Sequence, residues 1–231
     1  MIQKHMDSPK KTVIIALPGK EFSNVFLMQW SESLLKLTQL GYKIALTNEY
    51  SAYIPFTRMM TLGLDTMRGN DQIPFDGKVE YDVWVTIDSD IIFTPKQLIE
   101  LIEDTDKYPV VSGMYKMANS KYIPAVKEWN LAHFARNGAY EFIDPETFDK
   151  DVKHHDVAYV GMGFMACTRQ VLEKIKYPYF NYPTEENEID GKVISQIFSE
   201  DVSFCKRVTD AGFKISINTD VKLGHEKKLI I

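Results

Sequence analysis

The chain has 231 residues, of which 45% are hydrophobic and 26% are charged, as in a water-soluble protein with a substantial core. Its formal net charge of −5 and the lack of a dense Lys/Arg block argue against nucleic-acid binding. No segment is long and apolar enough for a signal peptide or a transmembrane helix. The two cysteines, Cys167 and Cys205, lie in apolar surroundings, which favours reduced, packed thiols and a cytoplasmic location.

The first half of the sequence alternates between strand and helix patterns. Short apolar runs predict buried strands at residues 11–17, 42–46, 83–87 and 110–115, and amphipathic segments predict helices at about 27–40, 55–64 and 94–103. Gly41 is placed to end the first helix, and Thr94-Pro95-Lys96-Gln97 is a capping box that begins the third. This alternation predicts an α/β fold with a mostly parallel sheet flanked by helices, in which ligands bind beyond the carboxyl ends of the strands.

The second half is more mixed. We expect short strands at residues 125–129, 139–143, 157–160 and 164–168, a short helix at 171–175 and a late strand at 214–217. Ser199 is typical of a helix N-cap, and the helix that it begins runs to about Ala211, before Gly212. We interpret residues 1–231 as one domain, with a nucleotide-type α/β half at about 12–118 and a loop-rich half at about 119–231.

Two aspartates one residue apart follow the third predicted strand. Asp88-Ser89-Asp90 ends the apolar run VWVTI, although acidic residues are poor strand formers and are costly to bury unpaired. One interpretation is a turn in which the carboxylates accept hydrogen bonds from backbone N–H groups. The other is a site for Mg²⁺ or Mn²⁺, because two hard oxygen ligands this close suit such ions and leave positions open for phosphate oxygens.

A second acidic pair follows Ser199. Glu200 and Asp201 would occupy the first turn of the helix that Ser199 begins. In one interpretation they only complement the helix dipole. In the other, the same position keeps a carboxylate ionised and aimed out of the helix start, as a catalytic base requires.

Two further features are less specific. The loop Gly161-Met162-Gly163-Phe164 suits a close approach by a ligand, and equally suits a tight turn between two strands. If a ligand approaches this loop, we expect that ligand to be the donor sugar or the acceptor. His225 follows a strand-like segment after the acidic helix, unlike the histidines that we interpret as surface or packing residues, which are His5, His133, His154 and His155.

The order of these features resembles that of GT-A glycosyltransferases, in particular the small nucleotide-sugar transferases of the family 2 type, including compact viral and phage members. The resemblance extends from about Thr12 to His225. It rests on the order, spacing and strand context of Pro18, Glu49, Arg58, Asp88-Ser89-Asp90, the loop at 161–164, Glu200-Asp201 and His225. It implies a GT-A fold whose first half binds a nucleotide-sugar donor and whose second half binds the acceptor.

The resemblance assigns the donor to the first half of the chain. Pro18 and Glu49 would hold the base of the nucleotide, and Arg58 would lie near the diphosphate. Ser89 and Asp88 would also bind the donor, with Asp88 facing the ribose or the metal. Because Glu49 could accept a hydrogen bond from uracil or from guanine, UDP is preferred and GDP is possible.

The resemblance also implies a metal ion and a base. Asp90 and His225, with Asp88, would hold Mn²⁺ or Mg²⁺, which neutralises the diphosphate as it leaves. Glu200 and Asp201 would be catalytic, and Asp201 would take the proton of the acceptor hydroxyl as it attacks opposite the diphosphate. The anomeric carbon would pass through oxocarbenium character and its configuration would invert.

The chain departs from the family pattern in two places. It has Thr57-Arg58-Met59 where many relatives have alanine-arginine-asparagine. It also lacks the Q-x-x-R-W motif and the membrane helices of processive synthases, which favours the transfer of a single sugar. The acceptor would be a glycan or another hydroxyl compound, and the sequence leaves the oligomeric state open.

Two other functions fit parts of the pattern. Phosphatases of the haloacid dehalogenase type also have D-x-D after an apolar strand, but after the first core strand and with Thr or Val two residues on, where this chain has Ile92. A non-catalytic module that binds nucleotides or sugars would keep the fold without turnover. Donor hydrolysis or transfer with Mn²⁺ distinguishes an enzyme from such a module.

Overall fold

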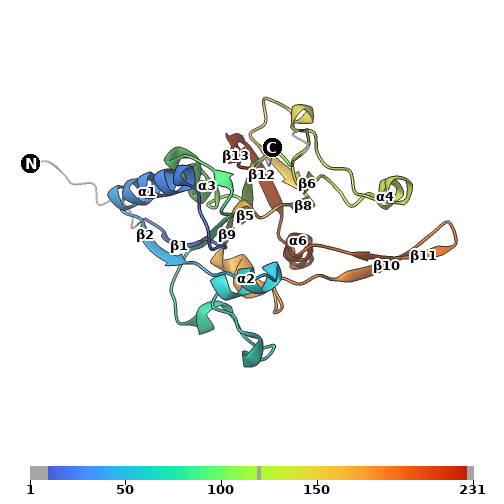
Figure 1. Ribbon diagram of the computed structural model, residues 1–231, viewed down its shortest axis with the longest axis horizontal. Helices are drawn as coiled ribbons and strands as arrows, with labels where there is room; N and C mark the ends of the chain where they lie inside the picture. The colour runs from blue at the N-terminus through green and yellow to red at the C-terminus, as the bar shows by residue number, and fades with distance from the viewer. Residues whose placement is uncertain (1–9, 119–120, 228–231) are drawn as a thin grey trace, which may run out of the picture.

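The computed structural model describes residues 10–118 and 121–227. In this part of the chain, seven strands form a central sheet in the order β2-β1-β3-β9-β5-β12-β7 (Figure 1). In chain order the strands are β1 (Thr12–Ala16), β2 (Lys43–Thr47), β3 (Val83–Ile87), β5 (Val110–Met114), β7 (His154–Val157), β9 (Phe164–Thr168) and β12 (Ile215–Lys222).

The strands of this sheet run mostly in one direction, as the sequence predicts. β1 lies parallel to β2 and β3, and β5 lies parallel to β12. β9 is antiparallel to both of its neighbours, β3 and β5, and β7 is antiparallel to β12 at the edge. Because β9 comes from the second half of the chain and separates two strands of the first half, the two halves share one sheet.

Helices cover both faces of the sheet. In β1, Val13 and Ile15 face one core cluster, whereas Ile14 and Ala16 face the other, the pattern of a strand buried on both sides. Residues of α1 (Asn24–Gln39) and α3 (Pro95–Asp104) pack into the first cluster (Figure 1). The helices of the second cluster are α2 (Ile54–Thr61), α5 (Arg169–Lys174) and α6 (Glu200–Asp210).

The helices begin and end where their sequences favour it. The Ser23 hydroxyl accepts a hydrogen bond from the Phe26 N–H at 3.1 Å to begin α1, and Gly41, with φ +86°, follows the end of that helix. Thr94 and Gln97 form the predicted capping box at the start of α3. Between residues 10 and 227, leaving out 119–120, each helix is too short or too polar to cross a membrane.

Among the described residues, three short strand pairs lie outside the central sheet. β4 (Ile91–Ile92) pairs with β13 (Gly224–His225), and β6 (Ala125–Val126) pairs with β8 (Tyr159–Val160). β10 (Thr184–Ile189) and β11 (Lys192–Ile197) form a hairpin that projects from the body of the molecule (Figure 1). The β4–β13 pair brings a late segment of the chain against the residues that follow β3.

Two strand predictions in the second half are wrong. Residues 139–143 contribute only a single bridge, between Val126 and Phe142. The strand expected at 157–160 is divided between β7 and β8, because Val157 pairs with β12 whereas Tyr159 and Val160 pair with β6. The second segment changes its partner strand along its length, which the local apolar pattern does not reveal.

The sequence patterns also miss α4 (Leu131–Asn137) and the β10–β11 hairpin. Glutamates at three positions of β10 hide the hairpin from a search for apolar alternation. Its turn does carry a signal, because Asp190 and Gly191 have φ of 51° and 72°, the two left-handed residues of a type I′ turn.

Both cysteines are buried thiols, as predicted. Cys167 and Cys205 are free and lie in the core. Burial raises the pKa of each thiol above its ordinary value. They are therefore packed side chains with little thiolate character.

Candidate functional site

The D-x-D motif forms a tight turn at the carboxyl end of β3. The backbone N–H of Asp88 donates to the carbonyl oxygen of Gly163 at 2.9 Å, and that of Ile91 donates to the carbonyl oxygen of Asp88 at 3.1 Å. The turn therefore lies between β3 and β4 and is also tied to the loop at 161–164. The two aspartate side chains leave it toward different surroundings.

Asp88 belongs to a buried cluster around Arg58. The guanidinium donates to both carboxylate oxygens of Asp88, at 3.1 and 3.2 Å, and its Nε donates to Glu200 Oε1 at 3.1 Å. The side chains of Arg58 and Glu200 are only 6% and 10% exposed. Burial alone would lower the pKa of Arg58, but the charges of Asp88 and then Glu200 outweigh it and raise that pKa above its ordinary value. Arg58 is therefore a fixed cation that joins α2, the end of β3 and the start of α6.

Asp90 points away from that cluster and meets His225. The pairing of β13 with β4, and a hydrogen bond of 2.7 Å from the Glu226 N–H to the Asp90 carbonyl oxygen, bring the two residues together. Asp90 Oδ2 lies 3.0 Å from His225 Nε2 and 2.9 Å from Lys227 Nζ. Gly224 permits this approach, because a Cβ atom there would lie 2.9 Å from the Cβ atom of Ile92.

The residues at this point fit a divalent cation. A carboxylate oxygen and an imidazole nitrogen that face the same point are suitable ligands for Mn²⁺ or Mg²⁺. Within the described ranges, no three His, Cys, Asp or Glu side chains gather as a metal cluster. Asp90 and His225 would thus supply two ligands, and an ion of this kind commonly completes its shell with water and phosphate oxygens.

Asp201 lies in the first turn of α6, where it is held by three hydrogen bonds. Tyr159 Oη donates to its Oδ2 at 2.8 Å, the Val202 N–H donates to its Oδ1 at 2.9 Å, and the Ser199 hydroxyl donates to Oδ1 as well. Burial, and then the charge and hydrogen bond of Asp201, raise the pKa of the Tyr159 phenol well above its ordinary value. Ser199 takes the N-cap position as predicted, but its hydroxyl binds this carboxylate in place of a backbone N–H group.

The glycines of the 161–164 loop suggest a close approach by a ligand, but in the structure the side chain of Tyr115 makes that approach. A Cβ atom at Gly161 or Gly163 would lie 2.5 or 2.8 Å from Tyr115 Oη. That hydroxyl also accepts a hydrogen bond of 3.0 Å from the Gly163 N–H. Met162 and Phe164 are buried, with 1% and 0% of their surface exposed. The backbone of this loop therefore rests on Tyr115, and its role toward a sugar stays a prediction.

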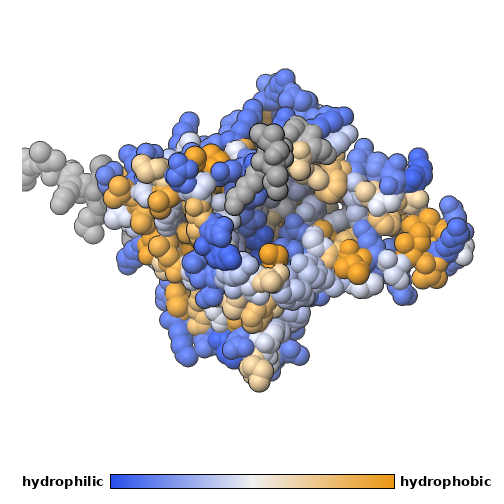
Figure 2. Space-filling model, viewed as in Figure 1, coloured by the Kyte–Doolittle hydropathy of each residue, from blue (hydrophilic) through white to orange (hydrophobic). Residues whose placement is uncertain are grey.

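The predicted donor residues lie around one cleft. It has a volume of about 640 Å³, and the surface near the middle of the view is hollowed among mostly hydrophilic residues (Figure 2). The predicted residues that line it are Pro18, Arg58, Asp88, Ser89 and Asp90. Glu49 lies beside it, because its carbonyl oxygen accepts a hydrogen bond of 3.0 Å from Gly19 N–H. Lysines 20 and 227 also line the cleft.

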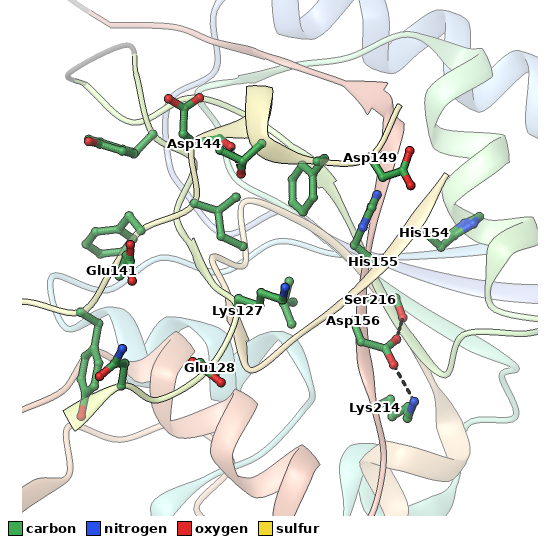
Figure 3. A pocket seen from close by; sticks show the side chains of 18 of the residues that line it. Lys127, Glu128, Glu141, Asp144, Asp149, His154, His155, Asp156, Lys214 and Ser216 are labelled. Carbon is green, nitrogen blue, oxygen red and sulfur yellow. Dashed lines mark hydrogen bonds and ion pairs between the residues drawn. The ribbon is translucent and has the colours of Figure 1, made fainter. Parts of the chain in front are cut away.

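A larger cavity lies elsewhere on the molecule. It measures about 1390 Å³ and is lined by β7, by residues between 121 and 149 (Figure 3) and by the segments that precede β5 and β12. Asp156, which lies on β7, accepts hydrogen bonds from Lys214 Nζ at 2.6 Å and Ser216 Oγ at 3.1 Å. The bond from Lys214 lowers the pKa of Asp156. Its lining contains none of the predicted site residues, and strands of this kind bind ligands at their other end.

Several residues of the site escape the sequence patterns. Tyr115, Tyr159 and Lys227 each contact a predicted site residue. Tyr115 lies within an apolar strand run, where an aromatic residue signals only packing. Tyr159 is one of the aromatic residues of the second half that could stack on an acceptor sugar, but the sequence does not indicate its contact with Asp201. Lys227 follows His225 by two residues, and this spacing is the one local signal that could have indicated it.

Neither a protein-family model nor a curated protein matches the sequence. Among solved structures, the crystal structure of A197 from STIV matches with a TM-score of 0.51 and 16% identity, over 95% of this chain and 96% of that chain. The inositol-1-phosphate CTP transferase from T. maritima has a TM-score of 0.46 and 10% identity, over 95% and 90% of the two chains. A glucosyl-3-phosphoglycerate synthase from Mycobacterium tuberculosis, solved with Mn²⁺, UDP and phosphoglyceric acid, has a TM-score of 0.48 and 13% identity, over 95% and 72%.

The likeness to A197 extends over nearly the whole of both chains and concerns the fold. The chain has the α/β fold that the sequence predicts, with a mostly parallel central sheet flanked by helices.

Proposed function

We propose that this protein is a glycosyltransferase that moves a single sugar from a nucleotide-sugar donor to a hydroxyl group of a glycan or another acceptor. The donor is a UDP-sugar by preference, or a GDP-sugar. The observation that carries the proposal is the meeting of two acidic pairs at one arginine. Because Asp88 and Glu200 both bind Arg58, the turn that carries Asp90 and the start of α6, which carries Asp201, are joined to the same arginine.

The donor would occupy the cleft of about 640 Å³, a volume within the usual range for small-molecule sites. Pro18 and Glu49 would hold the base, and Ser89 would contact the donor at the turn after β3. Arg58 is bound on both sides by carboxylates, so its main effect is to hold Asp88 at the diphosphate end of the cleft.

Asp90 and His225 would hold Mn²⁺ or Mg²⁺, which would neutralise negative charge on the diphosphate as the glycosidic bond breaks. The chemistry of the two ligands supports this assignment, since the carboxylate oxygen and the ring nitrogen lie 3.0 Å apart and Asp90 lines the donor cleft. Asp88 contributes through Arg58 and through the backbone of the turn.

Asp201 would act as the base. Its carboxylate would take the proton of the acceptor hydroxyl while that oxygen forms a bond to the anomeric carbon, and the bond from this carbon to the diphosphate would break on the opposite face. Inversion of configuration follows from this geometry. Tyr159 and Ser199 hold the carboxylate by hydrogen bonds, which keeps it oriented while it accepts the proton.

Calorimetry with UDP and GDP, each with and without Mn²⁺, tests the proposal. We expect binding that needs the metal, and release of nucleoside diphosphate when the matching nucleotide sugar is offered with an acceptor. Equal nucleotide affinity in EDTA would overturn the metal assignment. Nucleotide-sugar binding without either hydrolysis or transfer would favour the non-catalytic module.

A further inference from the structure

A lysine ammonium lies against the two atoms assigned to the metal. Lys227 Nζ is 2.9 Å from Asp90 Oδ2 and 2.6 Å from His225 Nε2. The side chain of Lys227 is 51% exposed and that of Asp90 is 43% exposed, so both face solvent at the cleft. The ammonium is therefore a third, positively charged member of this site.

The other ring nitrogen of His225 shows how the three groups interact. Nδ1 lies 2.8 Å from the carbonyl oxygen of Lys116, and a carbonyl oxygen can only accept, so Nδ1 carries the hydrogen. An ammonium at 2.6 Å from Nε2 then donates to a lone pair on that nitrogen. Nε2 and Asp90 Oδ2 are thus two acceptors that face each other and share one cationic neighbour.

The same two lone pairs are those that a metal would use. Two ligands at right angles around a cation, each about 2.1 Å from it, lie about 3.0 Å apart. Asp90 Oδ2 and His225 Nε2 are 3.0 Å apart, and the hydrogen bond from Nδ1 to Lys116 fixes the ring in the tautomer that a metal ligand needs. The ammonium and a divalent cation therefore require the same atoms and exclude each other.

We propose that the Lys227 ammonium occupies the metal position in the metal-free protein. It moves to the diphosphate when the metal binds together with the donor. The inference rests on the proposed function, because it needs Asp90 and His225 as metal ligands. Lys227 lines the donor cleft together with Asp88, Ser89 and Asp90. Its long, flexible stem lets the ammonium move from the carboxylate to a phosphate oxygen without leaving that cleft.

This exchange has a consequence for the order of binding. A metal ion that arrives alone must displace a lysine and leave its charge nearby, which is unfavourable. A metal ion that arrives with a diphosphate brings negative charge that the displaced ammonium can bind. The free metal should thus bind weakly, and the metal and the nucleotide should each increase the affinity for the other.

The first measurement is Mn²⁺ binding without nucleotide, followed by the loss of the free-ion signal in electron paramagnetic resonance. We expect Lys227→Met to bind Mn²⁺ at least about tenfold more tightly than the unaltered protein, because a like charge is removed from the site. Lys222→Met, which changes an exposed lysine at the end of β12, serves as the matched control and should bind as the unaltered protein does.

The second measurement is calorimetry of UDP, or of GDP if that is the nucleotide bound, at saturating Mn²⁺. We expect Lys227→Met to bind the nucleotide about tenfold more weakly, because a charge-assisted hydrogen bond to the diphosphate is lost. Unchanged nucleotide affinity would overturn the movement of Lys227 to the diphosphate.

The variant Asp90→Asn distinguishes a failure of the Lys227 proposal from a failure of the proposed metal site. If Asp90→Asn loses Mn²⁺ while Lys227→Met binds it no better than the unaltered protein, the metal site stands, and the proposal that Lys227 occupies the metal position is overturned. If Asp90→Asn binds Mn²⁺ as well as the unaltered protein, the metal site itself is wrong and the inference is overturned with it.

Discussion

Asp88 and Asp90 are one residue apart, yet they lie in opposite surroundings. Asp88 is bound on both oxygens by a buried guanidinium, whereas Asp90 is half-exposed beside His225 and Lys227. Glu200 and Asp201 divide in the same way, because Glu200 binds Arg58 and Asp201 binds Tyr159. In each acidic pair, one carboxylate belongs to the buried cluster around Arg58, which we call the inner cluster, and the other lies outside that cluster. The inner carboxylates determine position, and we propose that the outer ones carry the chemistry.

The largest effect is expected when an outer carboxylate loses its basicity. Asp201→Asn keeps the shape of the side chain and removes the basicity of the carboxylate. Turnover should fall by ~10²–10⁴-fold, the scale for the loss of a general base, while donor binding stays near normal. Steady-state kinetics and calorimetry would measure the two quantities. An Asn variant that turns over normally, or product NMR that shows retention at the anomeric carbon, would contradict the role of Asp201.

A substitution within the inner cluster should instead lower the free energy of unfolding of the protein. Arg58→Met removes the cation and leaves two carboxylates that were paired with it. The free energy of unfolding should drop by ~3–5 kcal/mol, as when one partner of a buried ion pair is removed. Urea denaturation followed by circular dichroism would measure it. If Arg58→Met is as stable as the unaltered protein, the inner cluster is not what fixes the positions of β3 and α6.

The two aspartates of the D-x-D motif offer the most direct comparison. Asp88→Asn should lower the free energy of unfolding by ~1.5–3 kcal/mol, because hydrogen bonds between charged groups are weakened. Asp90→Asn should change it by less than ~0.5 kcal/mol, as is usual for an exposed position, and should instead weaken Mn²⁺ binding. Denaturation and metal titration of both variants decide the matter. The comparison fails if the two substitutions have the same effect on both quantities.

A smaller effect is expected from the residue that orients the proposed base. Tyr159→Phe removes the hydrogen bond to Asp201 Oδ2 and keeps the packing of the ring. Turnover should fall about tenfold, which corresponds to a hydrogen bond to a charged group, with little change in the affinity for the donor. A separate measurement of kcat and KM would show it, and a change confined to KM would mean that Tyr159 acts on binding instead.

The sequence predicted much of the inner architecture because it is encoded locally. The buried runs of β1 and β3, the capping box of α3 and the glycine after α1 each depend on a few neighbouring residues. The division of each acidic pair does not, since Arg58 and Glu200 are 142 residues apart in the chain. Only the packing of α2, β3 and α6 decides which carboxylate of a pair meets the arginine.

The same distinction explains what the sequence did not predict. Asp190-Gly191 carried the turn signal of the β10–β11 hairpin, but the glutamates around it are unusual for a strand. Tyr115 looks like an ordinary core residue until the loop at 161–164 is folded against it. Lys227 acquires its partners only when β13 pairs with β4.

The contact between Tyr115 and the glycine loop limits how this part of the protein can evolve. A side chain at Gly163 would meet the ring carbon and the hydroxyl of Tyr115 at 2.8 Å, and one at Gly161 would also meet Pro124 at 3.0 Å. Alanine at either glycine can therefore be inherited only together with a smaller residue at position 115. A library of single substitutions would find both glycines intolerant, whereas a library that varies position 115 at the same time would recover alanine at position 163.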